Sequence, residues 1–250
     1  MNTPELTWLT AAAAVIFATV YVQYKPGARL ALRFARALAP RFAHSVPTAQ
    51  VTSVLALIFS GSSGLILAVV MILAAGTPLL GLLGDHVGIE LVFLGIGLGV
   101  AEAAVSLLLA SSAMAATIPL RFAQLGRDAT FELSIVGRGG WIRSYSHALD
   151  LLPIPAALAV ILLPLAAEEM LFRGMALTFL RPNGPIVAIV GSTFLFIAVQ
   201  FTGMPSWFSA LPAACGAVVV GLVHGYLFWS VPTILPLLVA HLVYFLFVAL

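Results

Sequence analysis

Three charged residues stand together inside a long apolar stretch of the chain. The segment 151–180 contains Glu168, Glu169 and Arg173. A carboxylate at the centre of a membrane-spanning helix costs about 2.5–3.5 kcal/mol on the insertion scale, so two adjacent ones need a compensating role. In an α-helix Glu169 and Arg173 are i, i+4 and face each other, whereas Glu168 points about 100° away. We expect a Glu169–Arg173 ion pair beside a cavity-facing Glu168, whose desolvated carboxylate suits a general base acting on water; a buried packing or oligomer-contact network is the alternative.

Two later polar residues could complete such a site. Gln200 and His241 each lie in an apolar stretch. At about 1.5 Å per residue from the outer ends of their helices, Glu168 lies roughly 20 Å deep, Gln200 roughly 22 Å and His241 roughly 14 Å. Glu168 and Gln200 are therefore predicted to be level, with His241 within one or two helical turns. A packing role for His241 stays open.

Four further residues carry weaker signals. His224, flanked by glycine, could join the site or only pack against a neighbouring helix. Glu102 could be a proton-relay or supporting acid, and Glu90 also lies in an apolar stretch. Cys215 is the only cysteine, which excludes an intramolecular disulfide and predicts a packing thiol.

The order of these residues resembles a known family. The CPBP family, also called Abi, comprises CAAX prenyl endopeptidases and bacteriocin-processing or immunity proteins, and its pattern is EExxxR, then FxxxH, then Hxxx(N/D). The corresponding segments here are Glu168-Glu169-x-x-x-Arg173, Phe196-x-x-x-Gln200 and His241-x-x-x-Phe245. The resemblance covers residues 151–250. It implies intramembrane proteolysis by a glutamate-activated water, with Glu168 as base, Glu169 and Arg173 as its support, and His241 as oxyanion donor.

Two positions depart from that pattern. Gln200 replaces the histidine of the second segment, and Phe245 replaces the Asn or Asp of the third. An amide forms hydrogen bonds but cannot take a proton, and a phenyl ring has no donor. Because the loss of one oxyanion donor costs about 10²–10³ in rate, both changes together could remove turnover. Tyr244 or His224 could substitute for the missing groups.

Three functions are therefore compared. The first is an endopeptidase that cleaves a membrane-embedded or lipid-anchored peptide, and the second is a catalytically impaired scaffold, immunity or chaperone protein. The third is an ion or proton transporter that uses Glu102, Glu168 and His241, which the lack of internal repeats disfavours. Glutamates with one histidine fall short of the three-ligand set of a catalytic zinc site, so no metal or other cofactor is expected.

The composition specifies the environment of these residues. Of 250 residues 62% are hydrophobic and 8% are charged, and the mean hydropathy is +1.14. A soluble domain carries about 25% charged residues, so the chain is predicted to be an all-α polytopic membrane protein. Nucleic-acid binding, a secreted disulfide scaffold and disorder are disfavoured, and the expected partners are membrane lipids and a membrane-associated peptide.

Seven spans account for the apolar stretches. A first, retained span is expected because the N-terminus carries Glu5 and no basic residue, unlike a cleavable signal peptide. Gly61-Ser62-Ser63-Gly64 in the second predicts close helix packing or a kink. Residues 1–150 form the N-terminal helices and 151–250 the CPBP-like core. The predicted spans are 6–24, 51–83, 87–120, 151–180 and three more, separated by connections at 181–185, 203–206 and 230–232.

Basic residues predict the orientation. In the segment 25–44, Arg29, Arg33 and Arg36 recur on one helical face, which indicates an interfacial helix or a loop with anchoring arginines. A second basic segment, 121–150, shares its side, whereas the opposite side carries chiefly Arg181. The charge bias predicts a multi-pass protein of a bacterial cell membrane with its N-terminus outside and its C-terminus cytoplasmic. The remaining charges used for this prediction are Glu5, Asp85, Arg121, Arg127, Arg138 and Arg143.

Overall fold

The computed structural model describes residues 3–43, 46–83, 88–126 and 142–249, and every regular element in these ranges is helical. The predicted all-α class is confirmed for this part of the chain. The elements are α1 (Thr3–Val22), η1 (Gln23–Gly27), α2 (Ala28–Leu38), η2 (Ala39–Arg41), α3 (Thr48–Ala74), α4 (Leu79–Leu83), α5 (Ile89–Leu125), α7 (Ile142–Leu151), α8 (Ile154–Glu169), η3 (Met170–Leu177), α9 (Thr178–Leu180), η4 (Arg181–Asn183), α10 (Pro185–Gln200), α11 (Trp207–Ser230) and α12 (Leu235–Ala249).

Four helical segments among the described residues are long and apolar enough to cross a membrane. They are Thr48–Ala74, Ile89–Gln124, Ile154–Asn183 and Trp207–Ser230, and two shorter apolar helices cover Pro185–Gln200 and Leu235–Val248. These helices fit a multi-pass membrane protein, whose backbone groups are satisfied within each helix. The count of seven spans stays a prediction.

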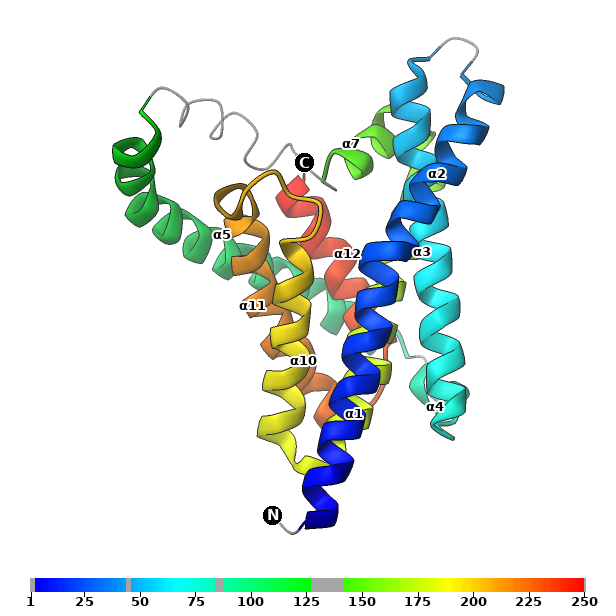
Figure 1. Cartoon of the computed structure of the whole chain (residues 1–250), viewed down its shortest axis with the longest axis vertical. Helices are drawn as coiled ribbons and strands as arrows, with labels where there is room; N and C mark the ends of the chain where they lie inside the picture. The colour runs from blue at the N-terminus through cyan, green and yellow to red at the C-terminus, as the bar shows by residue number, and fades with distance from the viewer. Residues whose placement is uncertain (1–2, 44–45, 84–87, 127–141, 250) are drawn as a thin grey trace.

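The helices form a bundle around the α8–η3 segment. Helix α3 packs against α8, α10 packs against α11, and α5 crosses the others obliquely while it contacts α11 and α12 (Figure 1). Helices α2 and α7 and the C-terminal ends of α5 and α12 lie at one end, and α4 and the start of α1 lie at the other (Figure 1). The described parts of the two basic segments, residues 25–43 and residues 121–126 and 142–150, thus lie toward one end, and the orientation of the chain in the membrane stays a prediction. Asp85, Arg127 and Arg138 lie outside the described residues.

The basic segment after α1 is helical. Helix α1 continues through the π-helical turn η1 into α2, so the loop interpretation of residues 28–38 is wrong. Ala31 and Ala35 are buried where α2 contacts α3, and Arg29, Arg33 and Arg36 are exposed on the other face. Small residues permit this close contact and leave the arginines free for solvent or headgroups.

The segment that carries the paired glutamates departs from a uniform α-helix. The predicted span 151–180 begins instead at Ile154, because Pro153 disfavours helical backbone in the residue before it. After Glu169 the chain enters the π-helix η3, which holds Arg173. Single π-helical turns are frequent at functional sites. The second π-helical turn, η1, contains Tyr24, whose ring lies 6.4 Å from that of Phe172 in η3.

The glycines at 61 and 64 permit close packing of α3. A Cβ atom on Gly61 would lie 2.7 Å from the backbone nitrogen of Pro164, and one on Gly64 would lie 2.8 Å from Nε2 of Gln23. The same Gln23 amide donates a hydrogen bond to the Ser60 carbonyl at 2.8 Å. Close packing, one of the two predictions for this motif, is confirmed, and it holds η1 and α8 against one face of α3.

We expect Gly61→Ala to destabilise the fold by about 1–3 kcal/mol, because the added methyl group must displace the Pro164 backbone. Gly97→Ala is the matched control: no atom lies within 4 Å of its Cβ position on α5, and alanine favours a helix over glycine. Thermal unfolding of the two variants in detergent measures the difference. Equal shifts in Tm would contradict the packing account.

Candidate functional site

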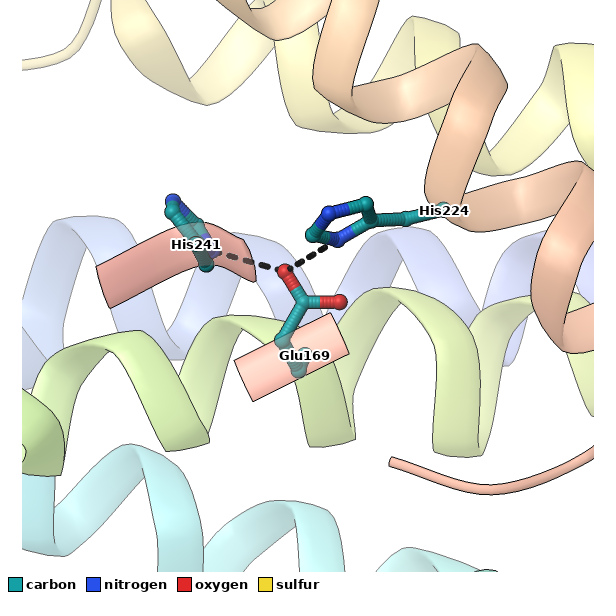
Figure 2. Close-up of side chains that lie close together, drawn as sticks. All are labelled: Glu169, His224 and His241. Atoms are coloured by element: carbon teal, nitrogen blue, oxygen red, sulfur yellow. Dashed lines mark hydrogen bonds and ion pairs between the residues drawn. The ribbon is translucent and has the colours of Figure 1, made fainter. Parts of the chain in front are cut away.

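Glu169 is the centre of the buried polar cluster. Its side chain extends from the end of α8 between His224 of α11 and His241 of α12 (Figure 2). Oε1 of Glu169 lies 2.7 Å from Nδ1 of His241 and 3.1 Å from Nδ1 of His224. Glu169 and His224 are completely buried and His241 is 5% exposed. Two imidazoles from separate helices therefore meet one carboxylate oxygen.

Arg173 neutralises the other side of the same carboxylate. Its Nε lies 3.5 Å from Oε2 of Glu169, so the predicted i, i+4 ion pair is confirmed despite the π-helix between them. Its Nη2 donates a hydrogen bond to the Val220 carbonyl at 3.0 Å. The guanidinium carbon also lies 4.8 Å from the centroid of the Phe196 ring, which is a cation–π arrangement. Arg173 thus connects η3 with α10 and α11.

Glu168 points away from this pair, as the helix geometry predicts. Its side chain is 18% exposed, against 0% for Glu169, and its Oε2 lies 3.8 Å from Nε2 of His241. Tyr24 lines the larger cavity together with Glu168. Glu168 is therefore the carboxylate of the pair that a small molecule could approach.

Two cavities meet at Glu168. One, of about 100 Å³, lies among α7, α8, α10, α11 and α12, and the other, of about 280 Å³, lies among η1, α2, α3, α7 and α8. Glu168, Gln200 and Tyr145 line both of them, and His241 lines the smaller one. The structure therefore brings Glu168, Gln200 and His241 to one cavity, and their common depth in a membrane stays a prediction.

The two departing residues have partners of their own. Gln200 is buried, and its amide donates to the Phe196 carbonyl of its own helix at 3.4 Å. Phe245 is buried too, with its ring centroid 4.6 Å from that of Tyr145. The Tyr244 hydroxyl lies beside Ser106 and against Gly216, and Tyr244 also lines the smaller cavity with Glu168, so its role as a substitute donor stays a prediction.

Glu102 and His224, two of the weaker candidates, do join the cluster. Oε1 of Glu102 lies 3.2 Å from Nε2 of His224, and Glu102 is 2% exposed. Glu102 lies on α5 and His224 on α11, and these helices pack together. Glu90, by contrast, is exposed near the start of α5, and Cys215 is buried on α11.

The sequence reasoning missed two tyrosines. Tyr24 and Tyr145 both line the larger cavity together with Glu168, and Tyr145 also lines the smaller one. Tyr24 follows an apolar stretch, and Tyr145 belongs to the segment that was assigned by its arginines. A tyrosine at a helix end is also typical of a membrane interface. The residue type alone therefore does not distinguish a tyrosine that lines the site from one that lies at the membrane surface.

The fold and this site define a helical membrane protein with a buried glutamate–histidine cluster. Residues 150–247 match the family model of the type II CAAX prenyl endopeptidases, described as Rce1-like. The resemblance that the three motif segments indicate is thereby confirmed for the C-terminal part of the chain. Comparison with curated proteins and with solved structures gives no match. The match indicates a CAAX-type intramembrane protease or a related membrane protein.

We expect Arg173→Met to lower the free energy of unfolding by about 3–5 kcal/mol, because it leaves the buried Glu169 carboxylate without its cation. The double variant Glu169→Gln/Arg173→Met should recover part of this loss. Unfolding in detergent, followed by circular dichroism, gives both values.

Arg181→Met is a closely matched control for Arg173→Met. Arg181 also stacks on an aromatic ring, 4.7 Å from the Trp229 centroid, and donates to a backbone carbonyl, that of Trp229, at 3.3 Å. It is exposed, so its loss should cost about 1 kcal/mol or less. Equal losses for the two arginines would show that the Glu169 pair contributes nothing specific.

Proposed function

We propose that the protein is an intramembrane endopeptidase in which Glu168 activates a water molecule. The observation that carries this proposal is that the two adjacent glutamate side chains have different environments. Glu169 is completely buried and contacts Arg173 and two histidines, whereas Glu168 lines both cavities. A general base needs access to the reacting water, and only Glu168 has it.

Contact with Glu169 determines which ring nitrogen of His241 carries the proton and which one faces Glu168. An ionised carboxylate only accepts hydrogen bonds, so Nδ1 of His241 donates to Oε1 of Glu169 across 2.7 Å. In the neutral ring Nε2 then has a free lone pair, and it lies 3.8 Å from Oε2 of Glu168. This separation is too long for a direct hydrogen bond, and a water that bridges the two groups fits such a distance.

The proposed reaction follows from this geometry. Glu168 takes a proton from the water while the water oxygen attacks the carbonyl carbon of the scissile peptide bond. The carbon–nitrogen bond then breaks, and the proton held by Glu168 passes to the departing nitrogen. The family resemblance implies that His241 donates a hydrogen bond to the oxyanion. Nε2 can do so only after it takes up a proton, which makes the ring a cation with a proton on each nitrogen.

The cavities suggest the class of substrate. The smaller one is lined mainly by apolar side chains, among them Leu165, Phe196 and Val248, which suits a lipid chain or an apolar side chain. The larger one adds polar groups at Ser60, Ser144 and other positions, which suits a peptide backbone. A peptide with a lipid modification close to its cleaved bond would place one part in each cavity and its scissile bond at Glu168.

We expect Glu168→Gln to lower cleavage by about 10²–10⁴-fold, because glutamine cannot accept the proton of the water. A prenylated CAAX peptide, incubated with the protein in proteoliposomes, provides the substrate, and mass spectrometry of the products provides the rate. Glu90→Gln is the control, since Glu90 is exposed near the start of α5. Equal cleavage by the parent and Glu168→Gln would exclude Glu168 as the base.

A second function, a non-catalytic membrane scaffold, is favoured by the two departing residues. Gln200 uses its amide on its own helix, and Phe245 offers only a ring against Tyr145. Under this alternative the parent protein cleaves nothing, and Glu168→Gln leaves its cellular phenotype unchanged.

Gln200→His separates the two functions. We expect it to raise turnover about tenfold or more, because an imidazole beside Glu168 adds a group that can take and return a proton. Gln200→Asn, which keeps the amide, should give no increase. If the parent and Gln200→His are both inactive on the prenylated peptide, the scaffold function is the better account.

A further inference from the structure

Three side chains form the junction of the two cavities. Among the described residues, Tyr145, Glu168 and Gln200 are the ones that line both cavities. They belong to α7, α8 and α10, so only the tertiary fold brings them together. A peptide bond that is held at this junction therefore faces a phenol, a carboxylate and an amide.

The proposed reaction needs hydrogen-bond donors at this junction. When water attacks the scissile carbonyl carbon, negative charge develops on the carbonyl oxygen, and donors fixed beside that oxygen lower the barrier. Such an oxyanion is commonly held by two donors. Nε2 of His241, which lies 3.8 Å from Oε2 of Glu168, can be one of them once it carries a proton.

The second donor is found by comparing the three junction residues. Glu168 starts the reaction as an ionised carboxylate, which only accepts hydrogen bonds. Gln200 has a competing partner, because its amide nitrogen donates to the Phe196 carbonyl of its own helix at 3.4 Å. The hydroxyl of Tyr145 is the remaining donor group of the junction.

Tyr145 is held firmly by its ring. Its side chain is 3% exposed and belongs to an apolar cluster with residues of α3, α8 and α12. Its ring centroid lies 4.6 Å from that of Phe245, at an angle of 42° between the ring planes. A donor stabilises a transition state most when its position needs no rearrangement during the reaction. This packing leaves rotation of the hydroxyl as the main freedom of the phenol.

The contact with Phe245 also places Tyr145 beside His241. Phe245 follows His241 by four residues on α12, so the two side chains lie on one face of that helix. Tyr145, His241 and Phe245 all line the smaller cavity with Glu168. Phe245 offers no donor itself, but the ring that packs on it carries one.

We propose that the Tyr145 hydroxyl donates a hydrogen bond to the oxyanion formed during peptide hydrolysis, together with Nε2 of His241. This inference rests on the proposed peptidase function and adds a catalytic residue to it. As Glu168 takes the proton of the water, negative charge moves from its carboxylate to the carbonyl oxygen, and the hydroxyl follows the charge. The phenol keeps its own proton, so the bonds that break and form are those of the hydrolysis alone.

Tyr145→Phe tests the proposal, because it removes the hydroxyl and keeps the ring that packs on Phe245. We expect kcat on a prenylated CAAX peptide in proteoliposomes to fall about 10²–10³-fold, the usual loss for one oxyanion donor, with KM changed by about twofold or less. Tyr226→Phe is the matched control and should keep the parent rate, since Tyr226 is 68% exposed on α11 and lines neither cavity.

Binding of a transition-state mimic separates a catalytic role from a structural one. A prenylated peptide with a phosphinate in place of the scissile amide carries a negatively charged tetrahedral group, whereas a reduced-amide peptide has no carbonyl oxygen. Tyr145→Phe should weaken phosphinate binding by about the factor by which it lowers kcat/KM, and should leave reduced-amide binding unchanged. Equal weakening for both peptides would show that the hydroxyl serves the fold or substrate binding, and would overturn the proposal.

The donor role and the peptidase function fail in different ways. A parent protein that cleaves the peptide as fast as Tyr145→Phe does overturns the donor role and leaves Glu168 as the base. A rate loss that appears in Tyr24→Phe or Tyr244→Phe but not in Tyr145→Phe also overturns it, because another phenol is then the donor. A parent protein that cleaves nothing removes the peptidase function, and the donor role with it.

Discussion

The burial of the Glu169 carboxylate is the constraint on which the rest of the structure depends. A fully buried carboxylate is tolerated only with charge and hydrogen-bond partners around it. Its two oxygens face Arg173 on one side and the imidazoles of His224 and His241 on the other. Arg173 belongs to η3, which directly continues α8, whereas the two histidines come from α11 and α12, so one side chain holds α11 and α12 against the α8–η3 segment.

The packing of α3 acts on the same centre from the opposite side. Gly61 and Gly64 bring α3 against Pro164 and Ala167, less than two turns before the paired glutamates. The same contact positions Gln23 and hence the π-helical turn that carries Tyr24. Where α3 and η1 approach each other, Glu168 shares the larger cavity with polar side chains of both elements, among them Gln23, Tyr24 and Ser60. The small residues therefore shape the larger cavity as well as the bundle.

Sequence reasoning could predict the parts of the site that depend on local spacing. The i, i+4 pair of Glu169 and Arg173 follows from helix geometry, and so does the separate direction of Glu168. The common level of Glu168 and Gln200 follows from helix length, with both residues lining the same cavities. The contact between Glu102 and His224 could not be predicted in this way, because it depends on how α5 crosses α11.

The same dependence on contacts between distant segments explains what local patterns left wrong or open at the level of the fold. Pro153 divides α7 from α8, a break that hydropathy alone does not show, and the basic segment after α1 is helical rather than a loop. Both features place tyrosines at the cavities that Glu168 lines: Tyr145 from α7, and Tyr24 from the turn that joins α1 to α2. Their relevance becomes visible only when elements far apart in the sequence are brought together.

The two glutamates also bear on whether the cluster serves stability alone. Replacing a buried ion pair with well-packed apolar residues is often neutral or stabilising, so the pair at Glu169 is weak evidence for a purely structural role. Glu168 is a stronger case, because it lies in a candidate membrane span, and among the described residues its one ion-pair contact is with His241. Such a residue costs stability and gains little in return as a packing group. Its position at the junction of two cavities, beside a polar cluster that holds His241 in place, is the arrangement that chemistry on a bound water requires.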